Sequence, residues 1–215
     1  MNTETHSEDR RILRRIFKIA IPHLSVRGDI DHVRISARFA RLLLKAEGGD
    51  EKIVLPAILL HDVGWSAVPA ESLVLAYGVR AKGNRFLKLN RTHEIQGAAI
   101  AKKILFDIGY PGSLISIIAA IIKRHDSGKK ADSIEEKIVK DADKLWRFSK
   151  VGFWEEAKRQ GISPMELHEY LSKKYHGWFF TQKALEIAGN RLKHRGREMR
   201  SASQNIRSGY PASNL

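Results

Sequence analysis

The segment from Glu51 to about His61 constrains the fold most, because it is apolar on nearly every side. A helix with apolar residues all around has no face for solvent, so it must lie at the centre of the molecule, surrounded by other elements. The segment ends in the pair His61-Asp62. The pattern therefore predicts a central buried helix that carries an imidazole and a carboxylate at its end.

Helical periodicity also dominates the rest of the chain, and no alternating segments joined by a tight turn indicate strands. The pattern therefore predicts an all-α protein. The first helix should stop before Pro22, because a proline inside a helix removes a backbone hydrogen bond. Residues 65–91 lack a regular pattern and are expected to form a long irregular connection with at most one short helix. Further helices are expected over residues 8–19, 29–46, 92–108, 113–125, from 133, 163–175 and 181–192, with N-caps at Thr92, Ser113, Ser133 and Ser163.

The length of 215 residues allows one domain with an appendage. We expect a single helical domain over residues 1–192, with a motif-bearing core at about 25–150 and C-terminal helices over 151–192 that close this core. Residues 193–215 are basic and rich in Ser, Asn and Gly, a composition typical of a disordered tail. The chain has no cysteine, so a metal site must use His, Asp or Glu, and disulfides and cysteine nucleophiles are excluded.

The charge balance favours negatively charged partners. The 38 Lys and Arg residues outnumber the 24 Asp and Glu residues, which gives a formal net charge of +14. Phosphorylated substrates, nucleic acid and anionic surfaces all fit this surplus. The longest apolar run, Leu114 to Ile122, is shorter than the roughly 18 residues of a membrane-spanning helix, and the acidic, polar N-terminus is unlike a signal peptide. We expect a soluble cytoplasmic protein with no membrane partner; its oligomeric state is left open.

Metal-ligand residue types occur at inward positions of several predicted helices. His32 lies on the apolar side of the helix over 29–46, and Asp143 lies in the helix that begins at Ser133. Each alone is compatible with ordinary packing, but burying Asp62 without a partner would cost several kcal/mol. A cation bound by His32, His61, Asp62 and Asp143 removes that cost. Two imidazoles and two carboxylates suit manganese, iron, cobalt, nickel, zinc or magnesium.

These residues resemble a known family. His32, the segment Ala57–Gly64 around His61-Asp62 and the segment Asp141–Leu145 together resemble the HD-domain metal-dependent phosphohydrolases. The resemblance covers about residues 25–150. It implies an orthogonal helical bundle in which His32, His61, Asp62 and Asp143 hold one divalent ion, while Asp141 has a supporting or structural role.

Two further histidines lie in segments that also resemble this family, residues 91–97 and 121–126. In family members with extra histidines, positions such as His93 and His125 either bind the substrate phosphate or take a second metal ion, with Asp62 bridging the two ions. The alternative is that both histidines are helix-end residues that face water. The sequence leaves the number of ions open.

The resemblance implies a small stand-alone phosphohydrolase that cleaves a phosphate ester or anhydride bond of a nucleotide or similar small substrate. A water activated by the metal would attack phosphorus, and Asp62 would orient or deprotonate that water. Positively charged groups near the phosphate would neutralise the charge that develops there. The candidates for this role are Lys144, His93, His125 and, in addition, Lys123 or Arg124.

Other functions compete with this interpretation. A nucleic-acid-associated phosphodiesterase or an RNA-binding protein would use the basic residues, and a non-catalytic regulatory HD domain would bind a ligand without turnover. The basic candidates are the row Arg34, Arg38, Arg41 and Lys45, the cluster within residues 80–91, and the tail. Such a row on a helix is more often a solvated face. Aromatic clusters at 146–154 and 178–180 favour core packing, with base stacking as the alternative.

Overall fold

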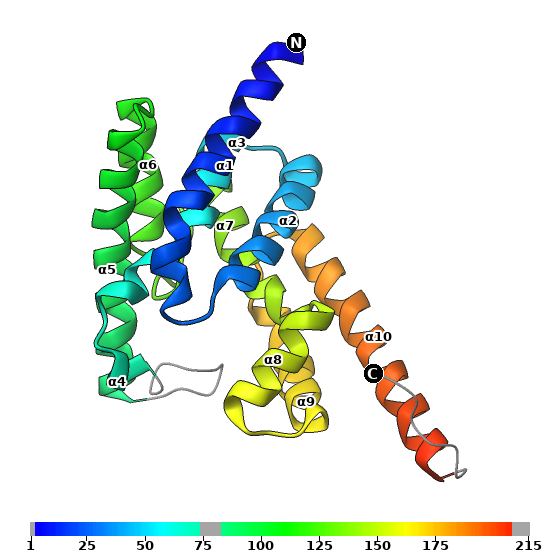
Figure 1. Cartoon of the computed structure of the whole chain (residues 1–215). Helices are drawn as coiled ribbons and strands as arrows, with labels where there is room; N and C mark the ends of the chain where they lie inside the picture. The colour runs from blue at the N-terminus through cyan, green and yellow to red at the C-terminus, as the bar shows by residue number, and fades with distance from the viewer. Residues whose placement is uncertain (1–2, 74–82, 208–215) are drawn as a thin grey trace.

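The computed structural model describes residues 3–73 and 83–207, and that part of the chain contains helices and no strand (Figure 1). The all-α prediction is thus confirmed. The elements are α1 (Thr3–Ser25), α2 (Ile30–Glu47), α3 (Glu51–Leu60), the 3-10 turn η1 (Val63–Ala67), α4 (Ala70–Leu73), α5 (Asn84–Asp107), α6 (Gly112–Ile122), α7 (Ile134–Leu145), η3 (Trp146–Phe148), α8 (Lys150–Gln160), α9 (Pro164–Lys174), η4 (Tyr175–Gly177) and α10 (Gln182–Arg207).

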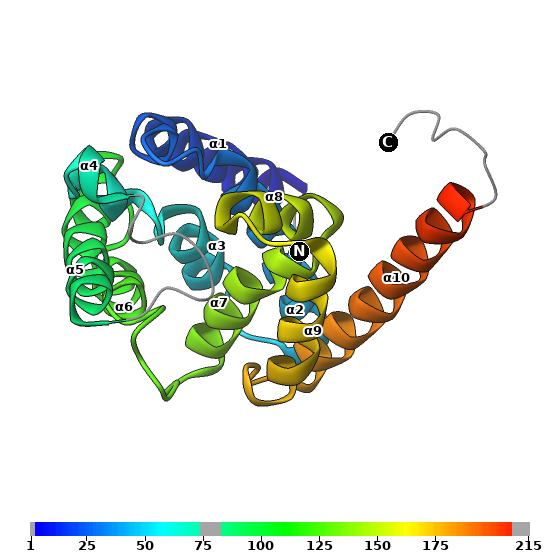
Figure 2. The same cartoon turned by 90° about the horizontal axis from the view of Figure 1, so that it is seen from below.

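Helix α3 lies at the centre of the bundle, as its apolar surface predicts. Every residue from Ile53 to Leu60 is buried, and α1, α2, α6 and α7 all pack against the helix. In Figure 2, α3 lies in the middle of the molecule, with α1 on one side and α7 on the other. A continuous hydrophobic core runs from Leu13 to Met199. The residues that directly follow α3 therefore lie in the interior of the molecule.

A glycine sets how closely η1 approaches α5. A Cβ atom at Gly64 would lie 1.9 Å from the His93 carbonyl oxygen and 2.4 Å from the Gly97 backbone nitrogen, far below van der Waals contact. Only a residue without a side chain allows this approach. The backbone directly after His61-Asp62 thus packs against the turn of α5 that carries His93.

Two predicted helix boundaries in the N-terminal half are wrong. Helix α1 continues through Pro22 to Ser25, where burial of Leu24 in the core stabilises the last turn beyond the proline. Helix α5 begins at Asn84, and Thr92 lies within it with its hydroxyl donating to the Lys88 carbonyl rather than capping the helix. The predicted irregular connection therefore contains η1, α4 and the start of α5. Residues 74–82, with Arg80 and Lys82, lie outside the described residues.

The C-terminal half also differs from the prediction. Helix α10 extends to Arg207, so the prediction of a disordered tail from Lys193 is wrong for residues 193–207. Leu192, Arg195 and Met199 are buried at helical spacing, and this contact with the body stabilises the extension. Residues 208–215 lie outside the described part of the chain.

The predicted start of a helix is confirmed where a serine side chain caps the backbone. Ser133 accepts a hydrogen bond from the Glu136 backbone, and Ser163 forms a full capping box with Glu166. The N-cap of α6 is Pro111 rather than Ser113. Among the described helices, none is both long enough and apolar enough to cross a membrane.

Candidate metal centre

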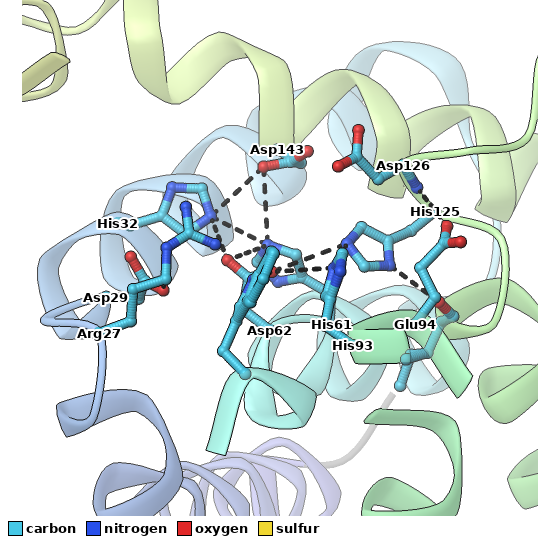
Figure 3. Close-up of polar contacts among 12 residues, drawn as sticks. Arg27, Asp29, His32, His61, Asp62, His93, Glu94, His125, Asp126 and Asp143 are labelled. Carbon is cyan, nitrogen blue, oxygen red and sulfur yellow. Dashed lines mark hydrogen bonds and ion pairs between the residues drawn. The ribbon is translucent and has the colours of Figure 1, made fainter. Parts of the chain in front are cut away.

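Four residues that are distant in sequence meet at one point in the interior: His32 near the start of α2, His61 and Asp62 at the end of α3, and Asp143 in α7 (Figure 3). The Nε2 atoms of His32 and His61 are 2.9 Å apart. His32 Nε2 lies 3.2 Å from Asp62 Oδ2 and 3.3 Å from Asp143 Oδ1. His61 Nε2 lies 3.4 and 3.6 Å from the same two oxygens. All four side chains are buried.

The end of α3 allows the adjacent pair to face the same point. Successive residues of a regular helix point about 100° apart. Helix α3 stops at Leu60, Asp62 has φ −100° and ψ 2°, and η1 starts at Val63. This change of backbone geometry turns the Asp62 carboxylate toward the same centre as the His61 ring.

The histidine tautomers fit a cation at this centre. His61 Nδ1 lies 2.9 Å from the Ile58 carbonyl oxygen, and His125 Nδ1 lies 2.8 Å from the Ile122 carbonyl oxygen. A carbonyl can only accept, so each Nδ1 carries a proton, and the Nε2 of the neutral ring presents a lone pair. Such backbone contacts are typical of rings that ligate a metal through the other nitrogen. Without a metal, protons on Nε2 can balance the facing carboxylates; with a metal cation at the centre, the Nε2 lone pairs and the carboxylates would face the cation.

The pKa values of Asp62, Asp143 and His125 also indicate that this cluster contains negative charge that must be balanced. Burial would raise the pKa of Asp62, but the charge of His61 and hydrogen bonds from neighbouring histidines hold it well below its ordinary value. Hydrogen bonds from His32 and His61 likewise lower the pKa of Asp143 against the effect of burial. Burial alone would lower the pKa of His125, but the neighbouring carboxylate of Asp62 raises it to about 9. The two buried carboxylates are therefore ionised and need compensation by protons on histidines or by a metal cation.

His93 in α5 and His125 after α6 extend the cluster on the other side of Asp62. Their Nε2 atoms are 3.3 Å apart, and each lies 3.7 Å from Asp62 Oδ1. Both rings are buried, so the alternative of water-facing helix ends is wrong. Asp62 thus presents Oδ2 to His32 and His61 and Oδ1 to His93 and His125. The triads His32, His61, Asp143 and His61, Asp62, His125 each bring three possible ligand atoms within 4.8 Å of one another.

Trp65 is a site residue that no sequence motif predicted. Its indole N–H donates to Asp62 Oδ1 at 3.1 Å, and its ring stacks on His93 with centroids 4.0 Å apart and planes 8° apart. The guanidinium of Arg27 lies 4.4 Å from the Trp65 ring centroid. Trp65 lies three residues after Asp62, in the first turn beyond the His61-Asp62 pair, and this spacing is the sequence feature that could have indicated its place in the site.

Two buried charged residues hold the loop that carries His125. Glu94 accepts hydrogen bonds from the backbone N–H groups of Asp126 and Ser127, both at 2.9 Å. The fully buried Lys140 donates to the carbonyls of Arg124 and Gly128. The loop is therefore bound through its donors on one side and its acceptors on the other, and the position of His125 is fixed by side chains from α5 and α7.

The remaining predicted site residues divide into two groups. Lys144 lines the cavity beside the metal centre, and its Nζ donates to the Trp178 carbonyl at 2.9 Å. Arg124 pairs with Asp132 and Glu136, and Lys123 is exposed; neither lines this cavity. Their expected contact with a phosphate at the centre is therefore not supported, because their side chains are committed elsewhere or face solvent.

Asp141 has a structural role. Its carboxylate accepts hydrogen bonds from the backbone N–H groups of Phe180 and Thr181 and from the Thr181 hydroxyl, at 2.8 to 3.1 Å. It anchors the segment before α10 to α7 and does not face His32 or His61. Of the two aspartates, Asp143 is the one whose carboxylate contacts His32 and His61.

A cavity of about 250 Å³ opens beside the ligand cluster and is lined by His32, Asp62, His125 and Asp143. Its wall carries cations and indoles. These residues are Arg27, Lys144, Arg147 and Arg159, with Trp65, Trp146 and Trp178. The three arginines were not predicted, because they come from separate elements that only the fold brings together. Trp146 and Trp178 line the cavity, whereas Phe148 and Phe153 of the same aromatic clusters lie in the core.

Comparison with known proteins agrees with this geometry. The HD domain family model matches residues 29–147, more than half of the chain and the part that holds all six clustered histidines and aspartates. The fold is similar to the crystal structure of a predicted HD superfamily hydrolase from an uncultured Thermotogales bacterium, with 21% identity, a TM-score of 0.59, and coverage of 96% of this chain and 99% of that one. A search of curated proteins gives no match. The chain belongs to the HD domain family.

Proposed function

We propose that this protein is a metal-dependent phosphohydrolase that cleaves a phosphate ester or anhydride bond of a nucleotide or a similar small phosphorylated molecule. One observation carries the proposal. The Nε2 lone pairs of His61 and His125 and the carboxylates of Asp62 and Asp143 converge in a buried cluster that opens into a cation-lined cavity. Ligands of this kind hold a Lewis acid, and the cavity offers the positive charge that a phosphate needs.

His32, His61, Asp62 and Asp143 are the proposed ligands of a divalent cation. When bound, such a cation supplies Lewis acidity, which activates water as a nucleophile and polarises a phosphoryl oxygen. Manganese, iron, cobalt, nickel, zinc and magnesium are all compatible with the donor set. The two oxygens of Asp62 face different histidine pairs, so His93 and His125 are proposed to take a second cation or to bind the substrate phosphate directly.

The chain's own groups have distinct proposed roles. Asp62 Oδ1 accepts from Trp65 and is oriented to receive a proton from the attacking water or to hold that water in line. If no second cation is bound, His93 and the doubly protonated form of His125 would donate from Nε2 to phosphate oxygens. Lys144 adds positive charge at the cavity wall, although its Nζ is already bonded to a backbone carbonyl.

The shape and lining of the cavity support a small substrate. A volume of about 250 Å³ holds a few phosphate groups and part of a nucleoside rather than a folded nucleic acid. Indole rings of Trp146 and Trp178 at its wall provide flat apolar surface on which a base can stack.

The test combines metal content with turnover. We expect purified protein to carry one or two metal ions per chain by plasma mass spectrometry, and to release phosphate from members of a nucleotide panel when manganese, cobalt, magnesium or nickel is added. His61→Ala should lose both properties, whereas His176→Ala, a change of an exposed histidine, should keep them. No bound metal and no turnover with any ion would contradict the proposal and favour a non-catalytic regulatory role.

A further inference from the structure

We propose that Asn90 of α5 is a specificity-determining residue that hydrogen-bonds to a sugar hydroxyl of the substrate. This role rests on the proposed function and narrows its substrate class to nucleotides and sugar phosphates with a free hydroxyl on the sugar ring. Three observations support it: Asn90 is buried, its Oδ1 has no hydrogen-bond partner among the described residues, and it lines the cavity beside the metal centre.

Asn90 is a buried polar side chain whose hydrogen-bonding capacity is not used within the described part of the chain. Only 5% of the residue is exposed, and Oδ1 is fully buried without a partner. Such an amide destabilises a folded protein, because its hydrogen bonds to water are lost and nothing replaces them. An apolar side chain of similar size would avoid this cost. The amide is therefore useful only if a molecule in the cavity supplies the missing partner.

The position of Asn90 along α5 places it about one helical turn from the metal centre. His93 follows it by three residues, and His93 Nε2 lies 3.7 Å from Asp62 Oδ1. Residues three apart lie on the same side of a helix, about 4.5 Å apart along its axis. A phosphate bound at the metal centre thus brings the group next to it, rather than a distant part of the substrate, to Asn90. In a nucleotide or a sugar phosphate, that group is the sugar.

The cavity wall near Asn90 suits a sugar ring. Trp65 and Phe86 line the same cavity, and Phe86 packs against the small apolar cluster of Trp65, Val68 and Leu73. Phe86 also lies four residues before Asn90, on the same side of α5. A sugar ring has apolar C–H faces that contact aromatic rings, while its hydroxyl groups need polar partners. Apolar walls with a few polar groups that fix orientation are typical of small-molecule sites.

A hydroxyl is the ligand group that fits an asparagine best at this place. The amide has an acceptor oxygen and a donor NH2 group, and rotation about the Cβ–Cγ bond exchanges their positions. A hydroxyl both donates and accepts, so it pairs with either atom. The amide is uncharged and does not compensate phosphate charge. Its contribution is to distinguish substrates that carry the hydroxyl from those that lack it, because the latter leave the buried amide unpartnered.

The experiment compares two substrates that differ only in the sugar hydroxyls. Manganese-loaded full-length protein is assayed with adenosine 5′-monophosphate and with its 2′,3′-dideoxy counterpart, which lacks both ring hydroxyls. We expect kcat/KM to be about fivefold or more higher for the first nucleotide, the effect of one hydrogen bond to a neutral group. Asn90→Leu should lower kcat/KM for the first nucleotide by the same factor and leave the value for the dideoxy compound within about twofold of the wild-type value.

Thermal unfolding separates this role from a structural one. Without nucleotide, Asn90→Leu should keep or raise Tm, because Asn90 loses no hydrogen bond within the described part of the chain. Asn90→Ala carries the same kinetic test if the leucine variant does not fold. Gln96→Leu changes an exposed amide on the same helix and should leave both substrates unaffected. Equal losses for the two nucleotides together with a lower Tm would identify Asn90 as a structural residue and overturn the proposal.

A binding measurement distinguishes failure of this role from failure of the proposed function. Turnover of both nucleotides at equal kcat/KM by the wild-type protein would overturn the role of Asn90 and leave the phosphohydrolase intact. If neither nucleotide is hydrolysed, the proposed function fails, and calorimetric titration with the same two nucleotides decides the role of Asn90 alone. Weaker binding of the dideoxy compound by the wild-type protein, but equal binding of both by Asn90→Leu, would support it. Equal affinities in the wild-type protein, or no binding, would overturn it.

Discussion

The indole N–H of Trp65 donates to Asp62 Oδ1 at 3.1 Å, while the same indole ring lies flat on His93. Oδ1 is the carboxylate oxygen that faces His93 and His125, so the hydrogen bond sets the orientation of the group that joins both halves of the cluster. Trp65 therefore acts through Asp62 as a positioning residue.

Trp65→Phe removes this hydrogen bond and keeps an aromatic ring against His93. A hydrogen bond to a charged group contributes about 1.5–3 kcal/mol, so kcat should fall roughly 10- to 100-fold. Metal content should stay near that of the wild-type protein, because no proposed ligand is removed. Trp154→Phe, at a half-exposed position, is the matched control and should keep full activity. An unchanged kcat in Trp65→Phe would refute the positioning role.

Substitution of each aspartate of α7 by asparagine should affect a different property: metal binding for Asp143 and stability for Asp141. Asp143→Asn is expected to lose bound metal and turnover, because it removes a negative ligand from the centre. Asp141→Asn should keep the metal, but it weakens the hydrogen bonds to Phe180 and Thr181 and should lower the free energy of unfolding by about 1–3 kcal/mol. Plasma mass spectrometry and urea unfolding of both variants check this. Loss of metal in Asp141→Asn alone would reverse the assignment.

Gly64→Ala should disrupt the contact between η1 and α5. The new Cβ would lie 1.9 Å from the His93 carbonyl oxygen, so backbone must move, at a cost of about 3 kcal/mol or more. For a chain of this size, that lowers Tm by roughly 6–12 °C. Gly112→Ala, where nothing lies within 4 Å, should change Tm by less than about 4 °C. Calorimetry that gives equal Tm values for the two variants would contradict the close approach.

Tyr110 should make stability depend on pH in the alkaline range. Its hydroxyl donates to the Lys52 carbonyl at 2.6 Å, and burial, with Asp50 and Asp9 nearby, raises its pKa from 10.0 to about 12. Between these values the unfolded chain has released the proton and the folded chain retains it, so the free energy of unfolding falls as pH rises. Tyr110→Phe should be less stable at pH 8 by about 1 kcal/mol and should lose less stability between pH 10 and 12. Urea unfolding at several pH values tests this; parallel pH curves for the two proteins would contradict it.

Much of the fold follows from patterns within single helices. The apolar surface of α3 requires a central position, and the inward phase of His32 in α2 and the serine caps of α7 and α9 can be read without a structure. Boundaries were wrong where packing outweighs local preference. Helix α1 passes through Pro22, and α10 extends past Lys193, because buried residues beyond these points stabilise the extra turns.

The residue types of the candidate ligands were likewise determined by the sequence, since a carboxylate at the end of a buried helix requires a positive partner. Only the tertiary structure decided which oxygen of Asp62 faces which histidines, that His93 and His125 point inward, and that Arg27 and Arg159 meet at Asp29. Helical periodicity shows which face of one helix is buried, but not which residues of another helix it will meet. Those contacts depend on how close and at what angle the helices pack, which residues such as Gly64 allow.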